Sequence, residues 1–292
     1  MVIVNPSAGR SSYKNHLGSI LHALWSGGYE PTVHFTAKAG DAMELAAYAC
    51  GRFERIVCIG GDGTLSDVIN GLMAHPHGDR PLLGYVPMGT ANDVATTLNL
   101  SRDPVTATKR ILQGDPHPFD VGIMGDNNYF AYIAAFGAFT DVSYETEPDA
   151  KHALGHLAYV LNGLMQLSKL NSHRARVECD EGVFEDDFIF GGVTNSTSVA
   201  GLVRLDEEEV SLGDGLFEVL LIRNPRRASE LTEIITGVLN QDYSGPSVNL
   251  LHSRRIHFTF TEPVAWTRDG ENGGQHRELL LENRWQAVTL LY

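Results

Sequence analysis

The stretch Ile59-Gly60-Gly61-Asp62-Gly63-Thr64-Leu65 decides the fold of this chain. It follows the apolar run 56–59 and precedes apolar residues at helical spacing over 65–72, which is typical of a strand, a tight turn and a helix. Glycines let backbone N–H groups approach a ligand at the positive end of a helix, so the turn predicts an anion site. Asp62 would repel bare phosphate, and the combination therefore favours a divalent cation between the carboxylate and phosphate groups.

Two further loops have the same character. Pro87-Met88-Gly89-Thr90-Ala91-Asn92-Asp93 follows the apolar run 82–86, and Asn5-Pro6-Ser7-Ala8-Gly9-Arg10 follows the run 2–4. Asn92 and Asp93 have a simpler interpretation as the capping residues of the next helix. Because open α/β sheets bind ligands at the carboxyl ends of their strands, three polar loops after three strands nevertheless indicate one binding site.

The order of elements predicts two domains. Up to about residue 119, short apolar runs alternate with helical patterns, which favours a parallel sheet covered by helices. From residue 120 the pattern changes to many short β-like runs with turn signals between them. We therefore expect an α/β domain over 1–119 and a mainly β domain over 120–292, with at most a short return of the last strand to the first domain. An apolar stripe over 153–170 predicts a helix, either packed on its own domain or acting as a lipid-facing lid.

Composition excludes several classes of protein. The 22 basic and 36 acidic residues give a net charge of −14, which disfavours sequence-independent binding of nucleic acid. Cys50, Cys58 and Cys179 are few and widely spaced, so neither a disulfide framework nor a zinc site is indicated. The chain shows no export signal and no uninterrupted apolar span of membrane length, and a cytoplasmic location fits best.

The motifs NPSAGR (5–10), GGDGTLSDVINGL (60–72) and PMGTANDV (87–94), in this order, resemble those of the diacylglycerol kinase catalytic-domain family. That family also contains sphingosine kinases and related bacterial lipid kinases. Further segments that look like family landmarks extend the resemblance over almost the whole chain. They are Phe119-Asp120-Val121-Gly122, LGHLAYVLNGL (154–164), Asp214-Gly215-Leu216-Phe217 and Asp269-Gly270-Glu271. The resemblance implies a nucleotide-binding α/β domain related to phosphofructokinase and NAD kinase folds, and a C-terminal β-sandwich domain.

The resemblance also implies the cofactors ATP and Mg²⁺ and a set of site residues. Those expected around ATP are Asn5, Gly61, Asp62, Gly63, Thr64, Gly89, Thr90 and Asn92. Asp62, Asp93 and Asp214 are the expected metal ligands. The catalytic residues are Glu271, Asp62 and Asp93, and either Glu271 or Asp62 is the general base. We further expect Asp62 to have little packing of its own to lose on mutation.

Three departures from the family pattern are visible. Ser66-Asp67 stands where Asn-Glu is usual, Thr96 stands where Arg is usual, and Gly213 replaces the first of two aspartates, which puts a second metal in question. A non-catalytic regulatory or lipid-binding member stays an alternative, and an NAD kinase-like enzyme is a weaker one.

The implied reaction is transfer of the γ-phosphoryl group of ATP to a lipid alcohol, with diacylglycerol, converted to phosphatidic acid, as the first choice. A lipid substrate implies transient contact with a membrane surface and a peripheral location. The arginine pairs 226–227 and 254–255 are either ordinary surface charges or local anchors for anionic lipid. A homodimer is left open.

Overall fold

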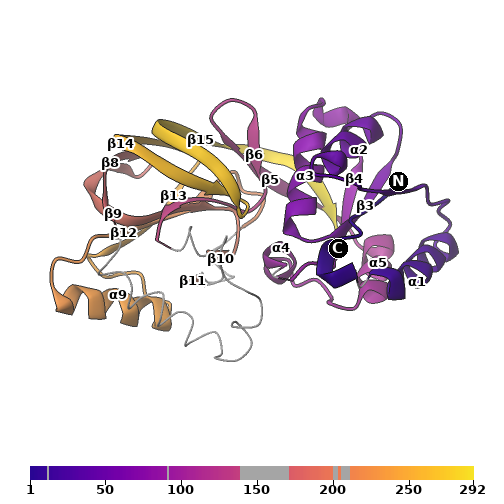
Figure 1. Ribbon diagram of the computed structural model, residues 1–292, viewed down its shortest axis with the longest axis horizontal. Coiled ribbons are helices and arrows are strands. Elements are labelled where there is room, and N and C mark those ends of the chain that lie inside the picture. The colour runs from indigo at the N-terminus through magenta and orange to yellow at the C-terminus, as the bar shows by residue number, and fades with distance from the viewer. Residues whose placement is uncertain (12, 91, 139–170, 200–202, 205–210) are drawn as a thin grey trace.

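The computed structural model describes residues 1–11, 13–90, 92–138, 171–199, 203–204 and 211–292. The helix predicted over 153–170 lies outside these residues. The chain forms an α/β domain that holds the N-terminus and a β-rich domain beside it (Figure 1). Within the described part of the chain, no helix combines the length and apolar character that crossing a membrane requires.

The N-terminal domain contains a parallel sheet in the strand order β2-β1-β3-β4. Its strands are β1 (Val2–Val4), β2 (Val33–Phe35), β3 (Arg55–Gly60) and β4 (Leu82–Pro87). Its helices are α1 (Tyr13–Ser26), α2 (Asp41–Ala49), α3 (Asp62–Met73), α4 (Asp93–Thr97) and α5 (Pro104–Gln113), with 3-10 turns η1 (Ala8–Ser11) and η2 (His77–Asp79). The predicted alternation of strands and helices is confirmed. Gly71 lets α2 and α3 pack closely, because a Cβ there would overlap the carbonyl oxygen of Met43.

The C-terminal domain is built from antiparallel strands. They are β5 (Pro116–Met124), β6 (Asn128–Phe130), β7 (Ile133–Gly137), β8 (His173–Cys179), β9 (Gly182–Thr194), β10 (Ser198–Val199), β11 (Val203–Arg204), β12 (Phe217–Arg223), β13 (Val248–Ser253), β14 (Arg255–Arg268) and β15 (Glu271–Leu291). The described helix of this domain is α9 (Ala228–Asn240). The interior of the sandwich is aromatic, with Phe136, Phe258 and Trp266 packed at centroid distances of 5.0–5.8 Å.

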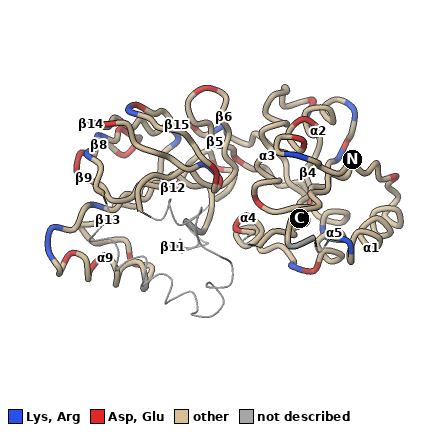
Figure 2. The backbone as a smooth tube through the Cα atoms, in the orientation of Figure 1, with Lys and Arg blue, Asp and Glu red and all other residues tan. Residues whose placement is uncertain are grey.

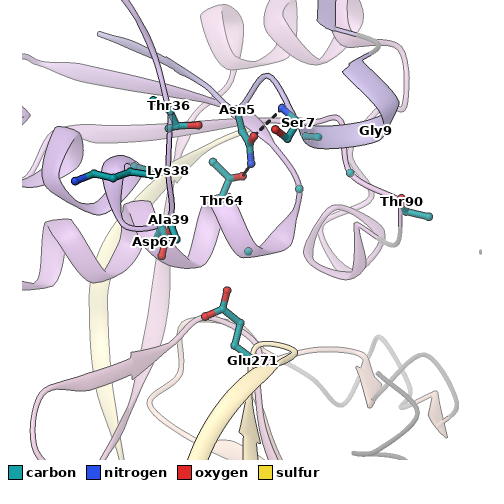
Figure 3. Close-up of a pocket in the computed structure, with 16 residues that line it drawn as sticks. Asn5, Ser7, Gly9, Thr36, Lys38, Ala39, Thr64, Asp67, Thr90 and Glu271 are labelled. Atoms are coloured by element: carbon teal, nitrogen blue, oxygen red, sulfur yellow. Dashed lines mark hydrogen bonds between the residues drawn. The ribbon is translucent and has the colours of Figure 1, made fainter. Parts of the chain in front are cut away.

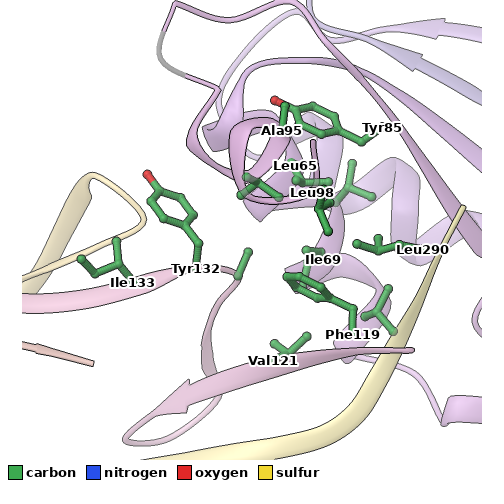
Figure 4. Packing of buried hydrophobic residues seen from close by; sticks show 14 of the residues in the cluster. Leu65, Ile69, Tyr85, Ala95, Leu98, Phe119, Val121, Tyr132, Ile133 and Leu290 are labelled. Carbon is green, nitrogen blue, oxygen red and sulfur yellow. The ribbon is translucent and has the colours of Figure 1, made fainter. Parts of the chain in front are cut away.

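The last strand, β15, joins the two domains. It pairs with β14 and β5 over most of its length, and Leu290 and Leu291 pair in parallel with β4. The return of the chain to the first sheet is therefore short, as expected, although the division of the chain at residue 119 stays a prediction. One buried cluster includes side chains from both domains, among them Leu65 and Ile69 of α3 and Ile133 of β7 (Figure 4).

Charged residues of both signs are spread over both domains (Figure 2). Three free thiols are present, those of Cys50, Cys58 and Cys179. The sequence likewise indicates no disulfide framework.

Candidate active site

A cavity of about 530 Å³ opens at the carboxyl edge of the parallel sheet (Figure 3). Its walls are loops that follow β1, β2, β3 and β4, closed from the other domain by Glu271. The lining residues are Asn5, Ser7, Ala8, Gly9, Thr36, Ala37, Lys38, Ala39, Ala42, Gly61, Gly63, Thr64, Asp67, Gly89, Thr90 and Glu271. Three loops that are separate in the sequence thus meet at one edge, as the strand-turn-helix pattern predicts.

Side-chain hydrogen bonds hold the first loop to the start of α3. Asn5 donates its Nδ2 hydrogen to Thr64 Oγ1 over 2.9 Å, and its Oδ1 accepts the backbone N–H of Ser7 over 2.9 Å. Figure 3 shows both bonds at the back of the cavity. Asn5 and Thr64 therefore fix the shape of the site and also line it.

Two glycines hold the second and third loops in direct backbone contact. A Cβ on Gly89 would lie 2.6 Å from the Cα of Gly61, so only glycine fits at this position. Asn92 supports this arrangement, because its Oδ1 accepts the N–H of Gly89 over 2.8 Å and its Nδ2 donates to the Gly89 carbonyl over 3.0 Å. Asn92 thus shapes the loop behind the cavity, and its expected contact with ATP stays a prediction.

The carboxylate of Asp62 accepts the backbone N–H groups of Asp93 (2.9 Å) and Val94 (3.3 Å), at the start of α4. Burial, and after it the neighbouring Asp93 charge, raises the pKa of Asp62 to about 6. The expectation that Asp62 has little packing of its own was wrong, because its side chain connects two loops. The sequence could not show this, since the two amides lie 31 and 32 residues away.

Glu271 reaches the site from the C-terminal domain. It follows the β14–β15 turn, where Asp269 (φ 49°) and Gly270 (φ 81°) both have positive φ, as an Asp-Gly type I′ hairpin requires. Its side chain is exposed and points toward α3 (Figure 3), and its Oε1 lies 4.0 Å from where a Cβ on Gly63 would stand. A carboxylate therefore faces the glycine turn across the cavity.

Asp269, two residues before Glu271, is buried, with 5% of its surface exposed. Its carboxylate accepts hydrogen bonds from Ser66 Oγ (2.7 Å) and from the backbone N–H groups of 131–133 (2.7–3.1 Å). Because the amides of 131–133 bind this carboxylate, the segment 128–135 forms two strands, β6 and β7, rather than one.

The sequence analysis missed part of the site. Thr36 and Lys38 lie in a fourth loop, after β2, and the polar segment Thr-Ala-Lys-Ala-Gly at the end of a strand was the available signal. Asp67 also lines the cavity, where burial raises its pKa and the charge of Glu271 raises it further. This residue had been noted only as a departure from the family pattern.

Asp214 lies in a different place from Asp62. Its Oδ1 accepts the N–H of Leu216 over 2.9 Å, and its charge acts on Asp120 and Glu218. Asp120 in turn accepts the backbone N–H groups of Gly215 and Gln286. Among the residues that the structure describes, no three His, Cys, Asp or Glu side chains are grouped so as to bind a metal ion.

Comparison with known proteins covers nearly the whole chain. The model of the diacylglycerol kinase catalytic domain matches residues 1–124, and that of the YegS C-terminal NAD kinase beta sandwich-like domain matches residues 135–291. A diacylglycerol kinase of Bacillus subtilis (strain 168) is 32% identical over 275 residues, which cover 94% of this chain and 89% of the relative. One from Staphylococcus aureus (strain MRSA252) is 34% identical over 278 residues, covering 94% and 86%. A crystal structure of a diacylglycerol kinase from Bacillus anthracis strain Sterne has a TM-score of 0.78 at 20% identity and covers 100% of this chain and 95% of that one, which shows a shared fold.

Proposed function

Since this chain belongs to the diacylglycerol kinase catalytic-domain family and is a lipid kinase, we propose that it transfers the γ-phosphoryl group of ATP to diacylglycerol. The observation that carries the proposal is the position of Glu271. This carboxylate from the C-terminal domain stands opposite the glycine turn of the N-terminal domain, across a cavity of about 530 Å³. Such an arrangement suits a reaction between a phosphate held on one side and a hydroxyl held on the other.

The triphosphate of ATP fits the N-terminal wall of the cavity. Gly61 and Gly63 leave backbone groups accessible at the start of α3, a twelve-residue helix whose N-terminal end favours negative charge. Gly89 and Thr90 add a second polar loop, and Lys38 adds a cationic side chain to the lining. We assign nucleotide binding to these residues together with Asn5 and Thr64.

Magnesium fits the pair formed by Asp62 and Asp93. The two carboxylates lie close enough together for the Asp93 charge to raise the pKa of Asp62, and a divalent cation between them would relieve this repulsion. When bound, Mg²⁺ would neutralise charge on the phosphate oxygens. The two amide hydrogen bonds to Asp62 hold its carboxylate in place. The predicted ligand Asp214 belongs to a separate position beside Asp120, so any metal it binds would be a second one.

The chemical step needs one proton acceptor. The hydroxyl oxygen of the lipid forms a bond to the γ-phosphorus, the bond from that phosphorus to the bridging oxygen breaks, and ADP leaves. The hydroxyl proton passes to a carboxylate late in this process. We assign this role to Glu271, because its side chain is exposed to the cavity whereas that of Asp62 is engaged by two amides.

Diacylglycerol is proposed as the alcohol because the relatives that match most of the chain are named diacylglycerol kinases. Its acyl chains stay in a bilayer, so the protein must touch a membrane surface while it works. Arg226 and Arg227 precede α9 and are 72% and 80% exposed, although each lies near an acidic partner. We propose that these arginines make a weak, local and salt-sensitive contact with anionic lipid, because a net charge of −14 opposes a broader attraction of the protein to the membrane surface.

The experiment is a substrate panel. Purified protein is incubated with γ-labelled ATP, Mg²⁺ and mixed micelles that contain diacylglycerol, a sphingoid base, phosphatidylglycerol or a polyprenol, and NAD is offered separately. We expect labelled phosphatidic acid, and no label in any lipid when a chelator removes Mg²⁺. Preferred labelling of another alcohol would overturn the choice of substrate. Labelling of NAD alone would favour the NAD kinase alternative. The absence of any labelled product would favour a non-catalytic role.

A further inference from the structure

A buried polar bond connects α3 of the first domain to the turn that carries Glu271. Ser66 lies one turn into α3, four residues after Asp62, and its Oγ donates to Asp269 Oδ2 over 2.7 Å. The two residues are 203 positions apart in the sequence. Ser66 is 9% exposed and Asp269 5%, so water does not compete freely for this bond.

The turn is rigid on its own side of the interface. Three backbone amides of 131–133 hold the Asp269 carboxylate, and the backbone N–H of Asp269 donates to the carbonyl of Ile133 over 2.9 Å. Because Gly270 alone separates Asp269 from Glu271, a fixed Asp269 also fixes the origin of the Glu271 side chain. The bond from Ser66 then connects that rigid turn directly to α3.

The same helix carries the glycine turn at its first residues. Asp62, Gly63 and Thr64 begin α3, and Ser66, two residues after Thr64, is buried. One helix therefore holds both the nucleotide loop and the contact to the opposite carboxylate. Asn70, one turn later, bonds to the backbone of Tyr129 in β6, and its Oδ1 also accepts a longer hydrogen bond from Arg268 at the end of β14 over 3.4 Å. Neither contact involves Asp269.

We propose that Ser66 is a positioning residue for phosphoryl transfer: its hydrogen bond to Asp269 sets the distance between Glu271 and the glycine turn at 60–64. The inference rests on the proposed function of Glu271. It also accounts for the departure at position 66, because serine in place of the usual asparagine still donates a hydrogen bond here. Ser66 itself is not among the residues that line the cavity.

The test begins with Ser66→Ala, which removes the connecting bond and leaves the three amide bonds of Asp269 intact. We expect kcat for diacylglycerol to fall about tenfold with the KM for ATP within about twofold, because a misplaced catalytic group slows the step without weakening nucleotide binding. Thr108→Val is the matched control. Thr108 is fully buried and its hydroxyl donates within α5 to the carbonyl of Pro104, so its loss should leave kcat unchanged.

A double-mutant cycle separates positioning from general destabilisation. If Ser66 acts through Glu271, then Ser66→Ala should have no further effect on kcat, beyond about twofold, in a Glu271→Gln background. An equal loss in both backgrounds, or a kcat of Ser66→Ala within about twofold of the wild type, would overturn the proposal.

Amide hydrogen exchange provides a readout that does not depend on catalysis. Peptides that contain 269–272 should exchange faster in Ser66→Ala than in the wild type or Thr108→Val, and equal exchange would show that Ser66 does not hold the turn. If the wild type labels no lipid alcohol, the proposed function fails, and the exchange comparison still decides whether Ser66 holds the turn.

Discussion

Asp62 Oδ2 accepts the backbone N–H of Asp93 over 2.9 Å. The acidic residue of one glycine loop therefore holds the first turn of α4, the helix that follows the next glycine loop. The bond connects two loops that end neighbouring parallel strands, β3 and β4. Under the proposed function Asp62 would have two tasks at once, since the carboxylate that orients α4 would also offer oxygen atoms to a cation. A substitution there affects both tasks.

Asp62→Asn should lower turnover at least about a hundredfold at saturating Mg²⁺, because the amide carries no charge for the cation. Steady-state assay with diacylglycerol measures this. Asp103→Asn is the matched control, since Asp103 caps α5 by accepting the N–H of Thr106 over 2.7 Å and lies away from the cavity. Near-normal turnover of Asp62→Asn would exclude both the metal role and the base role of Asp62.

The raised pKa of Asp62 predicts a pH-dependent loss of stability. Its folded pKa of about 6 is above the ordinary value of 3.8, so between these values the folded protein binds more protons than the unfolded chain. The free energy of unfolding must then fall as the pH rises through this window. Relative to Asp62→Asn, the wild type should lose about 2 kcal/mol between about pH 4.5 and pH 7. Urea unfolding of both proteins at both pH values checks this, and parallel changes would contradict it.

The sequence predicted the parts of the fold that depend on local pattern. The strand-turn-helix around Asp62 and the convergence of loops on one sheet edge are confirmed, because apolar periodicity and glycine position decide them locally. Asn92 stands directly before α4, as its simpler interpretation expects, but its side chain bonds to Gly89 and makes no capping bond to the helix.

What the sequence could not supply are contacts between distant residues. The bond from Ser66 to Asp269 depends on how the two domains pack, and no spacing rule covers a separation of 203 residues. Lys38 was overlooked for another reason, because its loop, Thr36-Ala37-Lys38-Ala39-Gly40, carries no glycine-rich motif.

Gly89→Ala should separate the two glycine loops. Its Cβ would stand 2.6 Å from the Cα of Gly61 and 2.7 Å from Asn92 Oδ1, and backbone cannot move aside easily. We expect a loss of about 1–3 kcal/mol in the free energy of unfolding and weaker ATP binding. Calorimetry of unfolding and of ATP binding measures both. Gly18→Ala in α1 is the control, since nothing lies within 4 Å of its Cβ, and it should stabilise by up to about 1 kcal/mol. Equal behaviour of the two variants would argue against the close loop contact.

The most direct test of the account is the rate of phosphoryl transfer to diacylglycerol in Glu271→Gln, measured in single turnover alongside ATP affinity. The account predicts a rate at least about a hundredfold below that of the wild type with ATP affinity little changed, since the N-terminal domain holds the nucleotide and Glu271 accepts the proton. Glu262→Gln, an exposed glutamate of β14 outside the cavity, should behave as the wild type. A rate for Glu271→Gln within a few-fold of the wild type would contradict the assignment and leave Asp62 as the general base.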